Sequence, residues 1–290
     1  MSNDELAGYR IAVTAERRAE EFITLIERHG ATVVHTPAIH VLPLADDSLL
    51  RDTTEAVLTE PPETTIVSTA LGFRGWLDAA REWGKAESLL AALDTGRIIT
   101  RGPKAKGAVR GAGLHEDWSP DTESSEGVLD RLREEGVAGR RILVQRHGTI
   151  TEWEPIVDLA DELSGLGAVV SPVSVYRWDR PSDQQPMRDL VEAIVGGGVD
   201  AVTFTSAPAV SSLLSTARDV DAVDALVAAF QEQVAAVCVG SVTASPLEAL
   251  GVSTMQPARP RLGSLAKHII EELPQRGSCT ESADMTQSGE

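Results

Sequence analysis

At 290 residues, the chain is long enough for one large domain or two ordinary ones. Its hydrophobic content of 42% suffices for buried cores, and aromatic residues at only 4% leave Ala, Val, Leu and Ile to fill them. The formal net charge of −18 disfavours general nucleic-acid binding and docking on anionic membranes. No apolar run is long enough for a membrane span, and the N-terminus lacks the apolar core of a signal peptide, so we expect a soluble cytoplasmic protein.

Cysteine and histidine usage disfavours cross-links and metal sites. Cys238 lies in an apolar run and Cys279 in a polar segment, so we expect no disulfide between them, as suits a reducing cytoplasm. The six histidines, at positions 29, 35, 40, 115, 147 and 268, have no ligand-like spacing. We therefore expect no metal site.

The predicted elements begin with a strand over residues 8–13 and a helix over 20–29, whose residues Phe22, Ile23 and Ile26 share one face. Further strands are predicted at 65–70 and 98–103, each followed by a helix, and a polar connector covers 115–126. In the second half, the strands are predicted at 139–144, 173–178, 201–206 and 237–240, with a loop over 179–185. Ser245 and Glu248 have the spacing of a capping box and indicate a helix start. Residues 274–290 have almost nothing to bury and are predicted to be disordered.

An internal repeat is the most informative feature of the sequence. Three segments of the first half recur in the same order in the second half. The pairs are 8–13 with 139–144, 65–70 with 201–206, and 98–103 with 237–240. Because short apolar strands alternate with helices, each copy predicts a parallel sheet covered on both faces.

Six loops follow the predicted strands, where ligands bind in open α/β sheets. The loops are rich in Gly, hydroxyl and basic residues, whereas acidic residues lie mostly in helices and connectors. This distribution predicts a site for a ligand that carries carboxylates, held by amides, hydroxyls and a few cations. The candidate binding residues in these loops are Thr14, Arg17, Thr69, Gly102, Pro103, Lys104, Arg146, Ser206, Ala207, Gly240, Ser241 and Thr243.

The candidate residues also have simpler structural interpretations. A Ser or Thr at a strand–helix junction is most often only a helix N-cap. The segment 102–107 resembles a phosphate-binding loop but lacks the spacing of one, so nucleotide binding is disfavoured. Tyr176, in the β-rich run 173–178, reads from the residues alone as a strand aromatic.

At these loops the chain resembles uroporphyrinogen-III synthase. The resemblance covers roughly residues 8–273, and its motifs are Val173–Arg177, Phe204–Pro208, Val239–Ala244 and Gln256–Pro260. It implies two similar parallel-sheet α/β domains, joined by a two-stranded connection, with a ligand cleft between them. One domain is expected to combine residues 1–38 with 177–273, and the other to cover 42–173, because in this family the chain crosses between domains.

The resemblance also implies an activity. The family closes hydroxymethylbilane, a linear tetrapyrrole with many carboxylates, into uroporphyrinogen III, with inversion of ring D, loss of water and no cofactor. This step serves haem, sirohaem or cobalamin synthesis. By motif, Tyr176 is the expected proton donor to the leaving hydroxyl, and Ser206 and Thr243 are expected to bind carboxylates or assist proton transfer. The partner is an anionic tetrapyrrole, and we expect a monomer.

An alternative function stays open at this point. Residues 72–76 and 101–104 are similar to the synthase-like region of certain actinobacterial transcription regulators of the nitrogen and nitrite type. That similarity implies a ligand-sensing or regulatory module without turnover. The residues after Pro274 are too few for the winged-helix DNA-binding domain of those regulators, so no nucleic-acid contact is expected on this chain.

Overall fold

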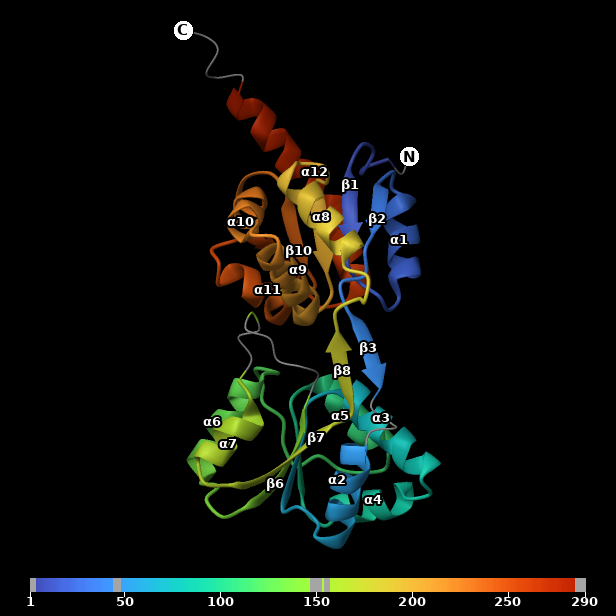
Figure 1. Cartoon of the computed structure of the whole chain (residues 1–290), viewed down its shortest axis with the longest axis vertical. Coiled ribbons are helices and arrows are strands. Elements are labelled where there is room, and N and C mark those ends of the chain that lie inside the picture. The colour runs from blue at the N-terminus through green and yellow to red at the C-terminus, as the bar shows by residue number, and fades with distance from the viewer. Residues whose placement is uncertain (1–3, 44–47, 147–152, 154–156, 285–290) are drawn as a thin grey trace. The chain divides into compact units, whose positions relative to one another are not determined.

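The computed structural model describes residues 4–43, 48–146, 153 and 157–284 (Figure 1). It divides the chain into two compact units, each assembled from separate segments. Unit 1 combines Met1–His40, Thr151–Pro155 and Asp179–Glu290, and unit 2 combines Val41–Ile150 and Ile156–Trp178. Within the described ranges, no helix combines the length and the apolarity needed to cross a membrane.

Unit 1 is built on a five-stranded sheet in which all neighbouring strands run parallel. The strand order is β11-β10-β9-β1-β2, so strands from both halves of the chain lie side by side. The strands are β1 (Arg10–Val13), β2 (Thr32–His35), β9 (Ala201–Phe204), β10 (Ala235–Cys238) and β11 (Thr254–Met255). The helices are α1 (Ala19–Glu27), α8 (Gln185–Val195), α9 (Ala207–Asp219), α10 (Val223–Glu232), α11 (Ser241–Glu248) and α12 (Leu262–Asp284).

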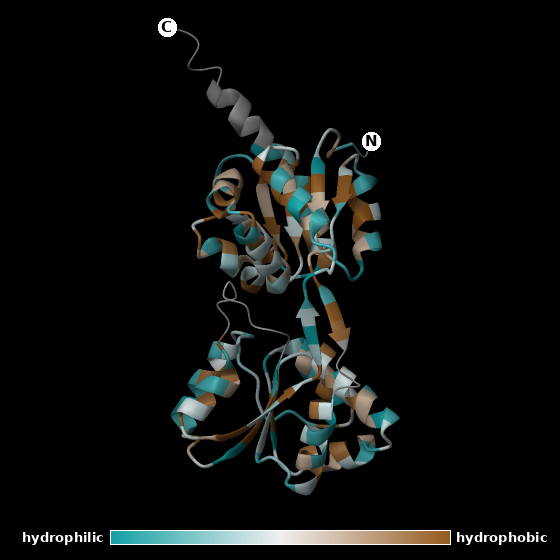
Figure 2. Cartoon of the chain, in the orientation of Figure 1, coloured by the Kyte–Doolittle hydropathy of each residue, from teal (hydrophilic) through white to brown (hydrophobic). Residues whose placement is uncertain are grey.

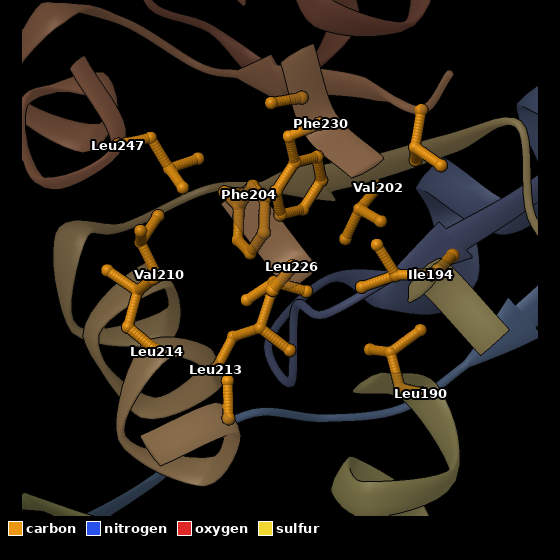
Figure 3. Packing of buried hydrophobic residues seen from close by; sticks show 14 of the residues in the cluster. Leu190, Ile194, Val202, Phe204, Val210, Leu213, Leu214, Leu226, Phe230 and Leu247 are labelled. Carbon is orange, nitrogen blue, oxygen red and sulfur yellow. The ribbon is translucent and has the colours of Figure 1, made fainter. Parts of the chain in front are cut away.

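Alternation along the strands gives unit 1 two hydrophobic cores. Successive strand side chains point to opposite faces. In β9, Val202 and Phe204 therefore join the core under α8–α11, while Ala201 joins the core under α1 and α12. Figure 3 shows the first of these cores, where the rings of Phe204 and Phe230 pack edge to face with centroids 6.4 Å apart.

Helix α8 covers the sheet of unit 1 with one apolar face. In α8, the buried residues Met187, Leu190, Val191 and Ile194 follow the 3.6-residue period of an amphipathic helix. Figure 2 shows this pattern as hydrophobic and hydrophilic residues that alternate along α8. α9 differs, because every residue from Ala207 to Ala217 is buried.

Unit 2 has a four-stranded parallel sheet of order β5-β4-β6-β7. Helices α2–α5 pack on one face of it and α6 and α7 on the other. Its sheet strands are β4 (Thr64–Val67), β5 (Arg97–Thr100), β6 (Arg141–Arg146) and β7 (Val169–Ser174). Its helices are α2 (Ser48–Thr59), α3 (Ala70–Glu82), α4 (Ala86–Leu93), α5 (Pro103–Gly111), α6 (Ser125–Glu135) and α7 (Leu159–Gly165).

The expected fold class, two parallel-sheet α/β domains with a two-stranded connection, is confirmed. The third sheet pairs β3 (His40–Pro43) with β8 (Tyr176–Asp179), and the chain changes unit within both strands. The repeat reappears in the strand orders, because β10-β9-β1-β2 of unit 1 corresponds in sequence pattern and position to β5-β4-β6-β7 of unit 2. Strands of one repeat thus complete the sheet begun by the other.

Two helices differ from the sequence-based expectations at one end each. Helix α12 continues through Pro274 to Asp284, where composition predicted disorder, and residues 285–290 lie outside the described range. Composition measures what a segment can bury, whereas a helix already anchored by packing extends without a new nucleation cost. Helix α11 begins at Ser241 rather than near Ser245, so the capping-box prediction was wrong and Pro246 lies inside the helix.

The polar connector 115–126 is a structural part of unit 2. Trp118 forms a parallel bridge with Ile99 of β5, and Asp117 exchanges hydrogen bonds with Ile98 through its backbone and its carboxylate. Glu116 is only 4% exposed and pairs with Arg110 at 2.6 Å and with Lys106 at 2.7 Å. The hydrogen bonds from Arg110, helped by Lys106, lower the pKa of Glu116 to about 2.

This buried carboxylate predicts an acid-dependent loss of stability. The pKa of Glu116 lies at about 2 in the folded chain against 4.5 for an ordinary glutamate, so its stabilising contribution is complete above about pH 4.5 and disappears as the pH falls toward 2. Because Arg110 is largely exposed, we expect Glu116→Gln to cost about 1–2 kcal/mol at pH 7. Urea unfolding of both proteins between pH 7 and 2.5 measures this difference, with Glu134→Gln as an exposed control on α6. A difference that stayed constant over that range would contradict the assignment.

Candidate functional site

Polar side chains gather at the carboxyl edge of the sheet in unit 2, where β4 leads into α3. Thr69 is the N-cap of α3, and its hydroxyl accepts a hydrogen bond from the Gly72 N–H at 3.0 Å. The same hydroxyl oxygen lies 3.2 Å from the phenolic oxygen of Tyr176, the first residue of β8. The N-cap interpretation is therefore correct for Thr69, and the residue also contacts the predicted proton donor.

Gln145, near the end of β6, holds this arrangement from the neighbouring strand. Its side chain is completely buried. Its Oε1 accepts from the Thr69 N–H at 3.0 Å, and its Nε2 donates to the Arg146 carbonyl at 2.7 Å and to the Thr69 hydroxyl at 3.3 Å. Gly72 leaves room for this amide, because a Cβ at that position would lie 2.1 Å from Nε2.

Tyr176 is both a core aromatic and a member of this polar group. It is 4% exposed, belongs to the core under α2–α5, and packs edge to face on Trp178 with ring centroids 5.6 Å apart. Its ring is therefore immobilised by packing, while its hydroxyl reaches Thr69. The interpretation of Tyr176 as a packed strand aromatic and its expected role as a donor are compatible in this geometry.

Arg101 supplies a positive charge close to Tyr176. It directly follows β5, and its N–H donates to the Val67 carbonyl of the adjacent strand at 3.0 Å. Burial lowers the pKa of the guanidinium, whereas attraction to Tyr176 and Glu126 opposes that shift. A partly desolvated guanidinium beside Tyr176 is suited to binding an anionic ligand.

The other candidates in unit 2 differ in what they can offer a ligand. Gly102 is the N-cap of α5 without a side-chain bond, Pro103 is the first residue of that helix, and both Pro103 and Lys104 are exposed. Arg146 instead pairs with Asp158 and Asp161, each at 3.1 Å. A ligand carboxylate at Arg146 must therefore compete with two carboxylates of the chain.

In unit 1, the loop after β1 and the loop after β9 carry four candidates. Thr14 is fully buried, and its hydroxyl donates to the Thr203 carbonyl at 2.8 Å, so this hydroxyl is used by the fold. Arg17 is exposed. Ser206 is the N-cap of α9 but makes no side-chain capping bond, unlike Thr69, and Ala207 is buried as the first residue of the helix.

The loop after β10 presents the last three candidates at the start of α11. Gly240 is the N-cap in an extended conformation, where a Cβ would lie 3.2 Å from the Pro260 side chain, and Ser241 is exposed. Thr243 is 5% exposed, and its N–H donates to the Gly240 carbonyl at 3.0 Å. β9 lies between β1 and β10, so the loops with Thr14, Ser206 and Gly240 follow three adjacent strands.

The structure thus groups the predicted residues by unit. Thr69 and Tyr176 lie together in unit 2, whereas Ser206 and Thr243 belong to unit 1. Sequence reasoning missed Gln145 and Arg101 as site residues, although both stood in the candidate loops. The available signal was their position at the strand ends, which does not reveal which side chains point into the polar group.

Comparison with known proteins identifies relatives that share this architecture. A family model described as "Uroporphyrinogen-III synthase HemD" matches residues 20–267. The uncharacterized protein YjjA of Bacillus subtilis (strain 168) is 28% identical over 272 residues, which are 92% of this chain and 98% of that protein. A mutant uroporphyrinogen III synthase of the extremely thermophilic bacterium Thermus thermophilus superposes with a TM-score of 0.77 at 27% identity, covering 93% of this chain and 100% of that one.

A second structure, the wild-type Thermus thermophilus synthase, gives a TM-score of 0.64 at 29% identity and covers 93% of this chain and 99% of its own. The family match spans most of the sequence, including both units and the polar group around Tyr176. The chain belongs to the uroporphyrinogen-III synthase family.

Proposed function

We propose that the chain is a working uroporphyrinogen-III synthase, which closes hydroxymethylbilane into uroporphyrinogen III with inversion of ring D and loss of water. The observation that carries the proposal is the Tyr176 hydroxyl, held 3.2 Å from Thr69 on an immobilised ring and close to Arg101. Loss of the terminal hydroxyl requires a proton donor, and a packed tyrosine in a polar group can supply the proton.

The first step is protonation of the leaving hydroxyl by Tyr176. Tyr176 donates its phenolic proton to the terminal hydroxyl of the substrate. The C–O bond then breaks, water departs, and an azafulvene cation forms on the substrate. Negative charge develops on the Tyr176 oxygen, where the positive charge of Arg101 stabilises it. A substrate carboxylate near Arg101 also reduces the repulsion between the guanidinium and the new cation. Ring closure then depends on the pose in which the chain holds the tetrapyrrole.

Candidate carboxylate-binding groups are present in each unit. We propose Arg101, Lys104 and the first amides of α5 in unit 2 as carboxylate-binding groups. In unit 1, Ser206, Ser241 and Thr243 lie at the starts of α9 and α11, where helix N-termini favour anions. Thr14 is left out of this set because its hydroxyl already donates to the Thr203 carbonyl. The candidate cleft between the units stays a prediction.

A second candidate function is a sensing module that binds a tetrapyrrole without turnover. It is favoured by the pairing of Arg146 with Asp158 and Asp161, which leaves fewer cations to position a flexible substrate. The two functions differ in what the chain does in a cell. Only an enzyme can replace a missing synthase.

Complementation tests the proposal. A bacterial strain that lacks its own uroporphyrinogen-III synthase is transformed with the gene for this chain, and growth without added haem is scored. We expect wild-type chain to restore growth and Tyr176→Phe to restore it weakly at equal soluble expression. If the soluble wild-type chain does not restore growth, the sensing module replaces the enzyme.

A further inference from the structure

The Thr69 hydroxyl has three polar neighbours, and their chemistry fixes where its proton lies. The neighbours are the Gly72 N–H at 3.0 Å, Nε2 of Gln145 at 3.3 Å and the Tyr176 hydroxyl at 3.2 Å. A hydroxyl can accept two hydrogen bonds and donate one. Which of the three bonds Thr69 donates therefore follows once the other two are assigned.

Gly72 and Gln145 both act as donors to Thr69. The backbone N–H of Gly72 can only donate. The amide of Gln145 has one possible orientation, because its oxygen must face the Thr69 N–H at 3.0 Å and its nitrogen must face the Arg146 carbonyl at 2.7 Å. The nitrogen of this amide is therefore the atom that faces the Thr69 hydroxyl. Both acceptor positions of that hydroxyl are occupied.

We propose that Gln145 and Thr69 are positioning residues that orient the proton of Tyr176. With its lone pairs occupied, Thr69 donates its own proton to the Tyr176 oxygen, and the Tyr176 proton is directed away from Thr69. Gln145 acts through Thr69 and not on the ligand. The role in turnover rests on the proposed function, whereas the arrangement of protons does not.

Packing holds this arrangement in place. Gln145 is completely buried, and Gly72 lies against its amide so closely that any side chain at that position would displace it. The Tyr176 ring is fixed by the core and by Trp178. When Tyr176 gives up its proton, the bond from Thr69 strengthens, because a hydrogen bond to a charged oxygen is stronger than one to a neutral oxygen.

Neutron diffraction of the deuterated protein tests the proton positions directly. We expect a deuteron on Thr69 Oγ1 that points at the Tyr176 oxygen, and a Tyr176 deuteron that points elsewhere. A Tyr176 deuteron on the line to Thr69 Oγ1 would overturn the proposal. This measurement needs no turnover, so it decides the arrangement even if the chain is a sensing module.

Kinetics test the role in the reaction. Thr69→Val and Gln145→Glu each remove a hydrogen-bond donor of this arrangement, since valine has no hydroxyl and glutamate has no Nε2 donor. We expect each variant to lower kcat for type III formation about tenfold with little change in KM, and Thr69→Ser to restore the rate because it keeps the hydroxyl. Circular dichroism and thermal unfolding identify a variant that fails to fold, and Thr69→Ser remains as the matched comparison.

Double-mutant analysis separates positioning from general damage. In the Tyr176→Phe background, Thr69→Val and Gln145→Glu should cost almost nothing further, because the group they orient is absent. Equal losses in both backgrounds would show that the two residues do not act through Tyr176. Absence of turnover in the wild type contradicts the proposed function and leaves the neutron result as the test of the proton arrangement.

Discussion

Tyr176→Phe is expected to lower kcat for type III formation by about 10²-fold while leaving substrate binding and folding nearly unchanged. Only the hydroxyl is removed, since the ring stays packed on Trp178 and in the core under α2–α5. General acids contribute about 10²–10⁴-fold, and the lower end applies because the leaving hydroxyl is labile and water can donate in its place. The measurement is the steady-state rate of type III formation from hydroxymethylbilane.

Tyr9→Phe is the matched control, because Tyr9 is the other tyrosine of the chain and packs on the core under α1 and α12. It should keep the wild-type rate. Tyr176→Ala should lose more than Tyr176→Phe, since it also empties a packed site. If Tyr176→Phe keeps the full rate of an active wild type, Tyr176 is a structural aromatic and its assignment as the donor is wrong.

Phe204→Ala is expected to cost about 3–5 kcal/mol of unfolding free energy. Phe204 is fully buried at the end of the central strand β9, and its ring packs on Phe230 (Figure 3). Alanine removes the ring contact and leaves a cavity among side chains of α9 and α10 that cannot collapse completely. Urea unfolding followed by circular dichroism measures the loss.

A size series and a surface variant act as controls for this prediction. Phe204→Leu should cost clearly less, because leucine fills most of the volume. Val220→Ala, at a site 40% exposed after α9, should change the unfolding free energy by less than about 0.5 kcal/mol. A loss for Phe204→Ala no greater than that for Val220→Ala would contradict the account of this core.

Strand order was predictable only in part from the sequence. The repeats indicated equivalent strands, and the correspondence of β10-β9-β1-β2 with β5-β4-β6-β7 has that origin. Strands such as β9 are buried on both faces, so their sequence, AVTF, has no exposed or charged side to show which strand lies next to it. The exchange of strands between the repeats therefore came from the family resemblance and not from periodicity.

The sequence predicted which loops contribute to the polar group around Tyr176, but not which side chains of those loops take part. Charge and glycine content drew attention to Lys104 and Arg146, yet Lys104 is exposed and Arg146 pairs with Asp158. Arg101 and Gln145 stand within a few positions of them, and their orientation depends on the strand register and on close packing at Gly72. Such packing is a tertiary property that no local pattern encodes.

The isomer ratio of the product shows whether the chain acts as a synthase. Hydroxymethylbilane closes spontaneously to the type I isomer, so purified chain at increasing concentration competes with that reaction. We predict that the type III fraction rises with protein concentration until type III is nearly the only product, and that Tyr176→Phe needs about 10²-fold more protein for the same fraction. A type I product at every concentration of folded wild-type chain would contradict the assignment of this chain as a synthase.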